Sequence, residues 1–92
     1  MRLQDTKQFR KSYDRLPKHI QEKAKKAFSL FMAHPHHPFH PSLHIKRMKG
    51  TDGIWEGRID YQYRFTFEFQ TDNDETIVIL RNIGSHDILL KE

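Results

Sequence analysis

The stretch WEGRIDYQYRFTF, residues 55–67, decides the fold of this chain. Over residues 63–69 aromatic side chains alternate with polar ones, which is typical of a strand with one face in the core and one polar face. Residues 54–59 predict the strand that pairs with it. The segment therefore indicates an antiparallel hairpin whose two faces differ in chemistry.

The length of the connection in this hairpin determines which side chains meet. A three-residue connection, residues 60–62, pairs Ile59 with Tyr63 and sets Arg58 opposite Arg64 on one face. A two-residue turn would separate the two arginines. We predict the three-residue connection.

Helical periodicity precedes the hairpin. Asp5 followed by Gln8 resembles a capping box, and apolar residues at helical spacing predict a first helix over about residues 6–15. Pro17 ends this helix or opens the next one, whose apolar stripe ends near Ala33. The stripe consists of Ile20, Ala24, Ala27, Phe28 and Phe31.

Further strand signals follow the hairpin. Residues 71–75 predict an acidic turn, and residues 76–83 form the apolar run expected of a strand buried on both faces. Gly84 is expected to break that strand, and residues 88–90 to add a short last one. Residues 2–4 suit an edge strand.

This order predicts an α+β fold, with two N-terminal helices packed on a small twisted sheet of three or four mainly antiparallel strands. A chain of 92 residues supplies one core, so residues 1–92 are expected to form a single domain. With 36% apolar residues that core is thin, and stability is expected to be modest.

Charge is distributed unevenly along the chain. Residues 1–50 hold 12 Lys/Arg and 3 Asp/Glu, whereas residues 51–92 hold 4 and 9, for a formal total of +4. The basic half is typical of a protein that binds a polyanion such as nucleic acid, and an acidic protein is the other partner it suits. Solvated lysine-bearing helix faces would give the same pattern.

The composition excludes several classes of protein. Cysteine is absent, so the chain has no disulfides, thiolate nucleophiles or cysteine-ligated zinc. No apolar run approaches the ~20 residues of a membrane span, and the first residues lack the apolar stretch of a signal peptide. We expect a cytoplasmic protein that has no membrane partner.

Two arginines that are forced together repel each other unless an anion lies between them. Arginine suits a phosphate, because its planar fork donates two hydrogen bonds and stays charged. Arg58 and Arg64 are therefore candidate phosphate ligands. The alternative is that Glu56, Asp60 and Glu68 neutralise them in cross-strand pairs.

Histidine and lysine side chains could complete such a site. His86 follows the apolar strand, and histidine is the residue type best suited to act as a general acid or base near neutral pH, although a lone histidine is often only a surface residue. His44 lies beside the basic turn of residues 46–50, so it can reach the same face. Candidate RNA contacts are His44, Lys46, Arg47 and Lys49.

Five histidines crowd residues 34–44, interrupted by prolines. The prolines prevent a regular presentation on a helix, and no cysteine or nearby carboxylate completes a familiar ligand set. We therefore predict no metal site and no cofactor. A loop that becomes more cationic in mild acid is the simpler interpretation of His34, His36, His37, His40 and His44.

The pattern as a whole resembles the RelE/ParE toxin superfamily over nearly the whole chain. Two helices precede Leu43–Gly50, which fits a leucine and lysine motif ending in glycine. The W-x-x-R-x-x-x-x-Y-R-x-x-F segment, residues 55–67, is the specific part, and the apolar strand ends in I-G-x-H. The resemblance departs at residues 88–90, which are aliphatic where many members carry an aromatic residue.

The resemblance implies a toxin of a type II toxin-antitoxin system. Members of the RelE-like branch cut mRNA in the ribosomal A site by attack of the 2′-hydroxyl, leaving a cyclic phosphate. By position, Arg58 and Arg64 would stabilise the charge on phosphorus and His86 would protonate the leaving 5′-oxygen. Expected partners are mRNA, the ribosome and an acidic antitoxin encoded nearby, with no small-molecule substrate and no metal.

Two other functions remain open. The ParE-like branch inhibits DNA gyrase by binding, which would not require His86. A relative of the fold that binds RNA or protein without cutting is the second alternative.

Overall fold

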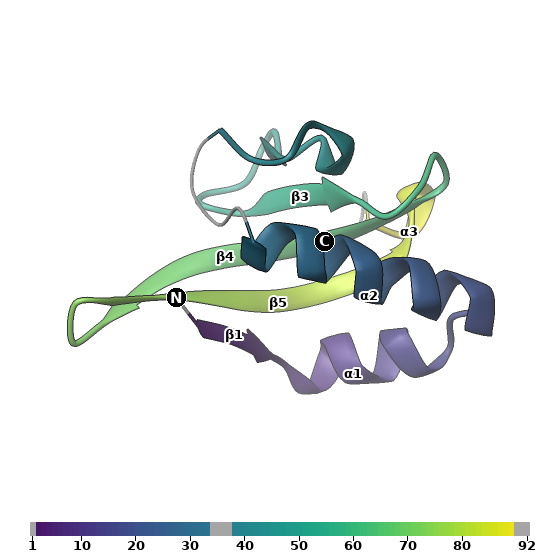
Figure 1. Cartoon of the computed structure of the whole chain (residues 1–92), viewed down its shortest axis with the longest axis horizontal. Coiled ribbons are helices and arrows are strands. Elements are labelled where there is room, and N and C mark those ends of the chain that lie inside the picture. Colours follow the sequence, from purple (N-terminus) through teal and green to yellow (C-terminus); the bar gives the residue numbers. More distant parts are fainter. Residues whose placement is uncertain (1, 34–37, 90–92) are drawn as a thin grey trace.

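In the computed structural model, which describes residues 2–33 and 38–89, the chain forms one five-stranded sheet with helices against it (Figure 1). The strand order is β1-β5-β4-β3-β2, with β1 parallel to β5 and the other pairs antiparallel. In chain order the elements are β1 (Arg2–Asp5), α1 (Lys7–Asp14), α2 (Lys18–Ala33), the 3₁₀ turn η1 (Pro41–Leu43), β2 (Lys46–Arg47), β3 (Trp55–Arg58), β4 (Tyr63–Asp72), β5 (Glu75–Ser85) and α3 (His86–Leu89).

The predicted α+β class, with two N-terminal helices and a mostly antiparallel sheet, is confirmed. The sheet has five strands where three or four were predicted. Residues 2–5 form the suspected edge strand by pairing with β5, and Lys46 and Arg47, which had suggested only a turn, pair with Glu56 and Trp55 of β3.

The start of α1 differs from the prediction. Thr6 is the N-cap, and its hydroxyl accepts from the amide of Phe9 (3.1 Å) while donating to the carbonyl of Leu80 in β5 (3.0 Å). A hydroxyl can both donate and accept, whereas a carboxylate only accepts. The predicted cap at Asp5 and its capping box with Gln8 are therefore wrong, and Asp5 instead ends β1.

Aromatic side chains form the core between α2 and the sheet. The apolar stripe of α2 faces inward as predicted, and Phe31 is fully buried with its ring centroid 4.9 Å from that of Phe67 on β4. Phe28 meets Phe65 edge to face at 5.1 Å. Burial of each such ring contributes roughly 1.5–3 kcal/mol, so the α2 face supplies much of the stability.

The hairpin between β3 and β4 has the predicted parity. The amide of Ile59 donates to the carbonyl of Tyr63 (3.0 Å), and Arg58 is the direct partner of Arg64. A glycine at position 57 lets β3 approach the core, because a Cβ there would lie 2.3 Å from the ring of Phe65. The hairpin therefore holds its aromatic residues on one face and its arginines on the other.

The second hairpin is tighter than the sequence suggested. The predicted acidic turn of residues 71–75 is reduced to Asn73 and Asp74, while β4 extends to Asp72 and β5 starts at Glu75. Both turn residues have positive φ, 51° and 66°. Two-residue hairpins favour this conformation, and Asn and Asp tolerate it better than most side chains.

The end of the chain also departs from the prediction. Pairing with β4 carries β5 through Gly84 to Ser85, so the glycine does not break the strand. Residues 86–89 then form the short helix α3 in place of the predicted strand, and Leu90 lies outside the described residues. A three-residue apolar run has too little period to separate helix from strand, and Asp87 in the first turn favours the helix.

The segment between α2 and β3 is described from residue 38 onward. His34, His36 and His37 of the histidine-rich loop lie outside the described residues. His44 is the C-cap of η1, and its φ and ψ are both 45°, in the left-handed region. No helix within residues 2–33 and 38–89 is long and apolar enough to cross a membrane.

Candidate functional site

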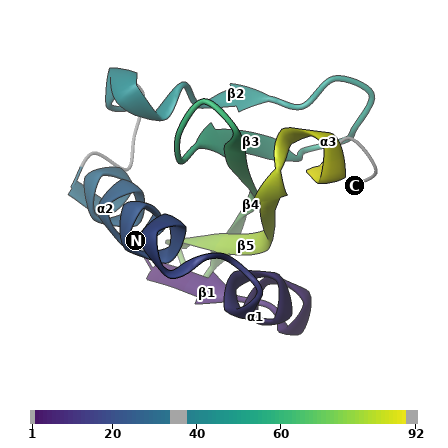
Figure 2. The ribbon, with the colours of Figure 1, turned by 90° about the vertical axis from the view of Figure 1, so that its right-hand side faces the viewer.

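The polar face of the sheet is the one that turns away from α2. Figure 2 shows α2 on one side of the sheet and α3 on the other. Register defines two rows of neighbours across this face. One row is Arg58, Arg64 and Gly84, and the other is Lys46, Glu56, Thr66 and Asn82.

A hollow of about 330 Å³ opens on this face. Its lining consists of His44, Ile45, Lys46, Glu56, Arg58, Arg64 and His86. A neighbouring hollow of about 350 Å³ shares Lys46, Glu56 and His86 and adds the turn residues, Arg47 and Lys49 among them. All seven site residues predicted from the sequence thus line one hollow or the other.

A wider hollow lies elsewhere and has a different character. It measures about 550 Å³ between β1, α1 and α2, and its lining is mostly apolar. Arg10, which borders it, is paired with Asp5 at 3.5 Å. Size alone would favour this hollow or one of about 630 Å³ along α2. The converging arginines and imidazoles instead favour the smaller hollow of about 330 Å³ as the site of anion chemistry.

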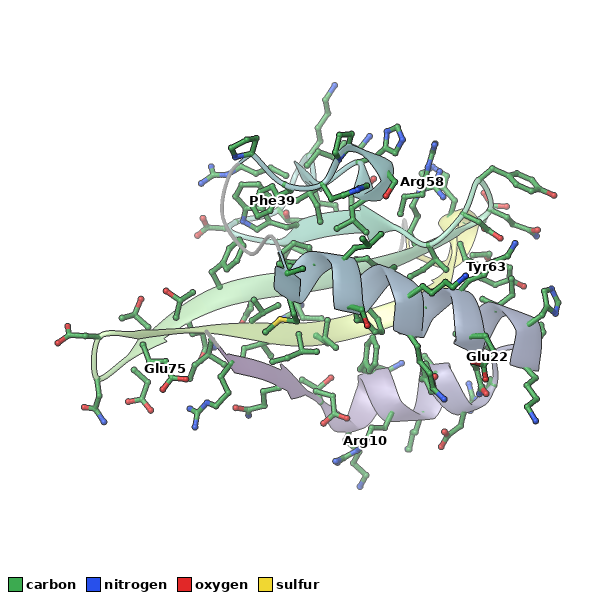
Figure 3. The ribbon with its side chains drawn as sticks, viewed as in Figure 1. Arg10, Glu22, Phe39, Arg58, Tyr63 and Glu75 are labelled. Carbon is green, nitrogen blue, oxygen red and sulfur yellow. The ribbon has the colours of Figure 1, made fainter. Side chains whose placement is uncertain are left out.

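Arg58 has hydrogen-bonding capacity to spare. Its Nη1 lies 3.3 Å from Nε2 of His44, and its Nε is buried without a partner among the described residues. A buried donor left unpaired is destabilising, so this atom is suited to receive an acceptor from outside the chain. Figure 3 shows Arg58 away from Glu75, which belongs to the distant β4–β5 hairpin.

Arg64 is held more firmly. Its Nη1 donates to the carbonyl oxygens of Asp60 and Tyr63, the latter at 3.0 Å. Burial and the positive charge of Arg58 lower the pKa of Arg64 below its usual value, and attraction to Glu56 and Asp60 offsets this only in part. An arginine still stays charged at neutral pH, so the pair presents two positive charges to the hollow.

The carboxylates near the arginines have other partners. Glu68 pairs with Arg81 at 3.1 Å, Glu56 with Lys46 at 3.6 Å and Asp60 with Lys23 at 3.4 Å. Among the ion pairs of residues 2–33 and 38–89, none includes Arg58 or Arg64. The alternative in which these three carboxylates form ion pairs with the arginines is not what the structure shows.

Asp60 has a role that sequence reasoning missed. Its Oδ1 accepts from the amides of Gln62 (2.9 Å) and Tyr63 (2.8 Å), which closes the three-residue turn. Burial alone would raise the pKa of Asp60, but these two amides and Lys23 lower it below its usual value. An aspartate that bonds to the backbone two residues on is a known turn signal, so the sequence held the clue.

The same turn positions His86. The backbone amide of His86 donates to the carbonyl of Gln62 (2.9 Å), and Ser85 pairs with Tyr63. His86 therefore starts α3 beside the hairpin turn that also fixes Arg58 and Arg64. One short connection thus orders three of the predicted site residues.

The basic turn is divided between two surroundings. Lys46 faces the polar side through Glu56, whereas the guanidinium of Arg47 lies 5.3 Å from the ring centroid of Trp55, a cation–π distance. Lys49 lines the second hollow only. Within residues 2–33 and 38–89, no group of three His, Asp or Glu side chains is arranged to hold a metal ion.

Comparisons with known proteins bear on the fold. No family model and no curated protein matched the sequence. Among solved structures, a YoeB/ParE toxin from Agrobacterium tumefaciens is similar with a TM-score of 0.72 and 21% identity, over 94% of this chain and 99% of that one.

Two more structures agree with this match. YafQ from E. coli gives a TM-score of 0.75 at 15% identity, covering 97% of this chain and 98% of that one. The RelB-RelE antitoxin-toxin complex from Methanococcus jannaschii gives 0.69 at 20% identity, covering 95% and 94%. The resemblance found in the sequence is thus confirmed for the fold, and this chain has the fold of the YoeB/ParE, YafQ and RelE toxins.

Proposed function

We propose that the protein is the toxin of a type II toxin-antitoxin system and that it cuts mRNA on the ribosome. The observation that carries this proposal is the hollow lined by Arg58, Arg64 and His86. Neither arginine forms an ion pair with a carboxylate in the described part of the chain. The buried, unpartnered Nε of Arg58 gives the hollow an unfilled place for an acceptor oxygen. A phosphodiester supplies such oxygens and the negative charge that two arginines favour.

The chemistry follows from the side chains present. The 2′-oxygen of the mRNA attacks the adjacent phosphorus, and Arg58 and Arg64 stabilise the charge that develops on the phosphate oxygens. His86 donates a proton to the departing 5′-oxygen, leaving a 2′,3′-cyclic phosphate and a 5′-hydroxyl. In this proposal Lys46, Arg47, Lys49 and His44 contact the neighbouring RNA backbone. The mechanism draws on no metal, cofactor or small-molecule substrate.

An acidic antitoxin is the proposed protein partner. Similar structures include the DinJ-YafQ and RelBE toxin-antitoxin complexes of E. coli. The first 50 residues of this chain hold 12 Lys/Arg against 3 Asp/Glu, so an acidic protein is attracted to them. A gene beside the one for this chain is the place to seek that partner.

Expression in cells tests the proposal. Wild type and His86→Gln are induced, and mRNA ends are mapped with a chemistry selective for 2′,3′-cyclic phosphates. His19→Gln is the matched control, because His19 is exposed on α2, which lies on the other side of the sheet. We expect codon-spaced cuts from wild type and His19→Gln. In His86→Gln the amount of mRNA cleavage should fall by at least about 100-fold.

Other results would contradict the proposal. Intact mRNA together with DNA damage would identify a gyrase poison, and intact mRNA with stalled growth alone would identify a non-catalytic binder. Cuts that persist unchanged in His86→Gln would remove His86 from the mechanism.

A further inference from the structure

We infer that His44 is the general base of the proposed cleavage, so that it removes the proton of the attacking 2′-hydroxyl. This inference rests on the proposed function, which gave His44 only a place beside the RNA. It turns the hollow into a site with two imidazoles of opposite tasks, His44 accepting a proton and His86 donating one.

The strand order places the two imidazoles on opposite sides of the arginines. In the order β5-β4-β3-β2, Arg64 and Arg58 lie on the two middle strands. His86 follows β5 on one side, and His44 precedes β2 on the other. All four side chains line the same 330 Å³ hollow. In-line displacement at phosphorus needs its base and acid on opposite sides of the phosphate, and this order supplies that arrangement.

The hydrogen bond to Arg58 orients the ring of His44. A guanidinium only donates, so Nε2 of His44, 3.3 Å from Nη1 of Arg58, must present its lone pair. A general base requires such a lone pair. When a phosphate binds the guanidinium of Arg58, the guanidinium no longer donates to Nε2 of His44. The lone pair of Nε2 can then accept from the 2′-hydroxyl.

Most of the charged groups around His44 are cations. His44 lines the 330 Å³ hollow and a smaller one of about 200 Å³ beside η1. The titratable and charged side chains that share these two hollows are Lys46 from β2, Glu56 and Arg58 from β3, Arg64 from β4, His86 from α3 and His40 from the loop before η1.

Glu56 is the competing base. It is 9% exposed and its carboxylate pairs with Lys46 at 3.6 Å, so it lies deeper than His44 and is held by a cation. His44 is exposed at the rim, where a ribose hydroxyl can reach it.

The proposed step balances as follows. Nε2 of His44 takes the 2′-hydroxyl proton, the 2′-oxygen bonds to phosphorus, and the bond from phosphorus to the 5′-oxygen breaks. The imidazolium of His86 gives its proton to that 5′-oxygen. The products are the cyclic phosphate, the 5′-hydroxyl, protonated His44 and neutral His86, and exchange with water restores both histidines.

The backbone at His44 suggests a substitution that keeps the fold. Its left-handed conformation is unfavourable for most residues, but asparagine adopts it readily. His44→Asn therefore removes the base without adding strain. His40→Asn is the matched control, because His40 belongs to the same loop and caps η1 through Nδ1, which the asparagine oxygen can replace.

The experiment measures single-turnover cleavage of a short mRNA on ribosomes between pH 5.5 and 8.5, with wild type, His44→Asn, His40→Asn, His86→Gln and Glu56→Gln. We expect wild type and His40→Asn to show a bell-shaped profile. In His44→Asn the cleavage rate at neutral pH should fall by about 10²–10⁴-fold. The rate should also no longer decrease towards acid pH, because the base whose protonation causes that decrease is absent. In His86→Gln the decrease in cleavage rate towards alkaline pH should disappear instead.

A second substrate separates the base from the acid. If sulfur replaces the bridging 5′-oxygen, the leaving group departs without a proton, so this mRNA should rescue His86→Gln and leave His44→Asn slow. Two results would overturn the inference and leave the proposed function standing. One is that His44→Asn cleaves at the wild-type rate and keeps the decrease in rate towards acid pH. The other is that only Glu56→Gln loses that decrease. If wild type cuts no RNA, the proposed function itself fails and the inference with it.

Discussion

On the face of β3 and β4 that meets α2, Phe65 and Phe67 are fully buried against Phe28 and Phe31. On the opposite face, one residue along the chain, Arg58 and Arg64 face an open hollow and repel each other. The comparison shows that the alternation of side chains along each strand gives the two faces of one hairpin different roles. Stability comes from one face, and the other face can keep a destabilising arrangement that serves a ligand.

The largest effect is expected from the aromatic face. Phe67→Ala removes a ring in contact with Phe31 and leaves a cavity, so the free energy of unfolding should fall by about 3–5 kcal/mol. Urea denaturation followed by circular dichroism measures this. A loss below about 1 kcal/mol would mean that the α2 face does not carry the fold.

The arginine face should behave in the opposite way. Arg58→Met keeps the aliphatic stem and removes the charge, so cleavage should fall by about 10²–10³-fold. The free energy of unfolding should stay the same or rise by up to about 1 kcal/mol, because the repulsion of Arg64 is relieved. Unfolding and single-turnover cleavage are measured on the same preparation. A variant that is both active and less stable would contradict this division of roles.

The turn that joins β3 and β4 should show an intermediate effect. Asp60→Ala removes the acceptor for the amides of Gln62 and Tyr63, and the free energy of unfolding should fall by about 1–2 kcal/mol. Asp60→Asn keeps the oxygen and should lose less. Cleavage should fall in Asp60→Ala as well, because the register of Arg58 and Arg64 depends on this turn.

Asp60 should also make stability depend on pH. Its pKa in the folded protein is below its ordinary value, so the carboxylate stabilises the fold above about pH 4, and that contribution is lost as the pH falls further. Melting temperatures between pH 2.5 and 6 in wild type and Asp60→Asn measure the effect. An identical acid dependence in both proteins would show that Asp60 contributes nothing to it.

The smallest effect is expected at the rim of the basic turn. Lys49→Gln removes one candidate phosphate contact from an exposed loop, so the free energy of unfolding should change by less than about 0.5 kcal/mol. RNA binding should weaken modestly, and the slope of log affinity against log salt should fall by about 1. Filter binding over a salt series measures this. An unchanged slope would remove Lys49 from the interface.

The hairpin could be predicted from the sequence because its signals are local. Alternation over residues 63–69 gave the two faces, and the three-residue connection gave the pairing of Arg58 with Arg64. The apolar stripe of α2 could also be predicted, since the helical spacing of apolar residues repeats several times in a helix of 16 residues.

The parts that could not be predicted depend on distant partners. Two residues of β2 become a strand only because β3 lies beside them, and Thr6 caps α1 while bonding to Leu80, 74 residues away. At the site, the contact between His44 and Arg58 arises from the left-handed end of η1, which has no sequence period. The site residues and the pairing of the two arginines could be predicted from the sequence, but the contact between His44 and Arg58 could not.

A double-mutant cycle on Arg58 and Arg64 tests the central claim most directly, namely that both arginines act on one phosphate. Single-turnover cleavage is measured for Arg58→Met, Arg64→Met and the double variant, with Arg58 and Lys49 as a control pair. If the arginines work as a unit, the double variant should be slower than the slower single variant by no more than about 10-fold, while losses in the control pair multiply. Losses that also multiply for Arg58 and Arg64 would contradict the account.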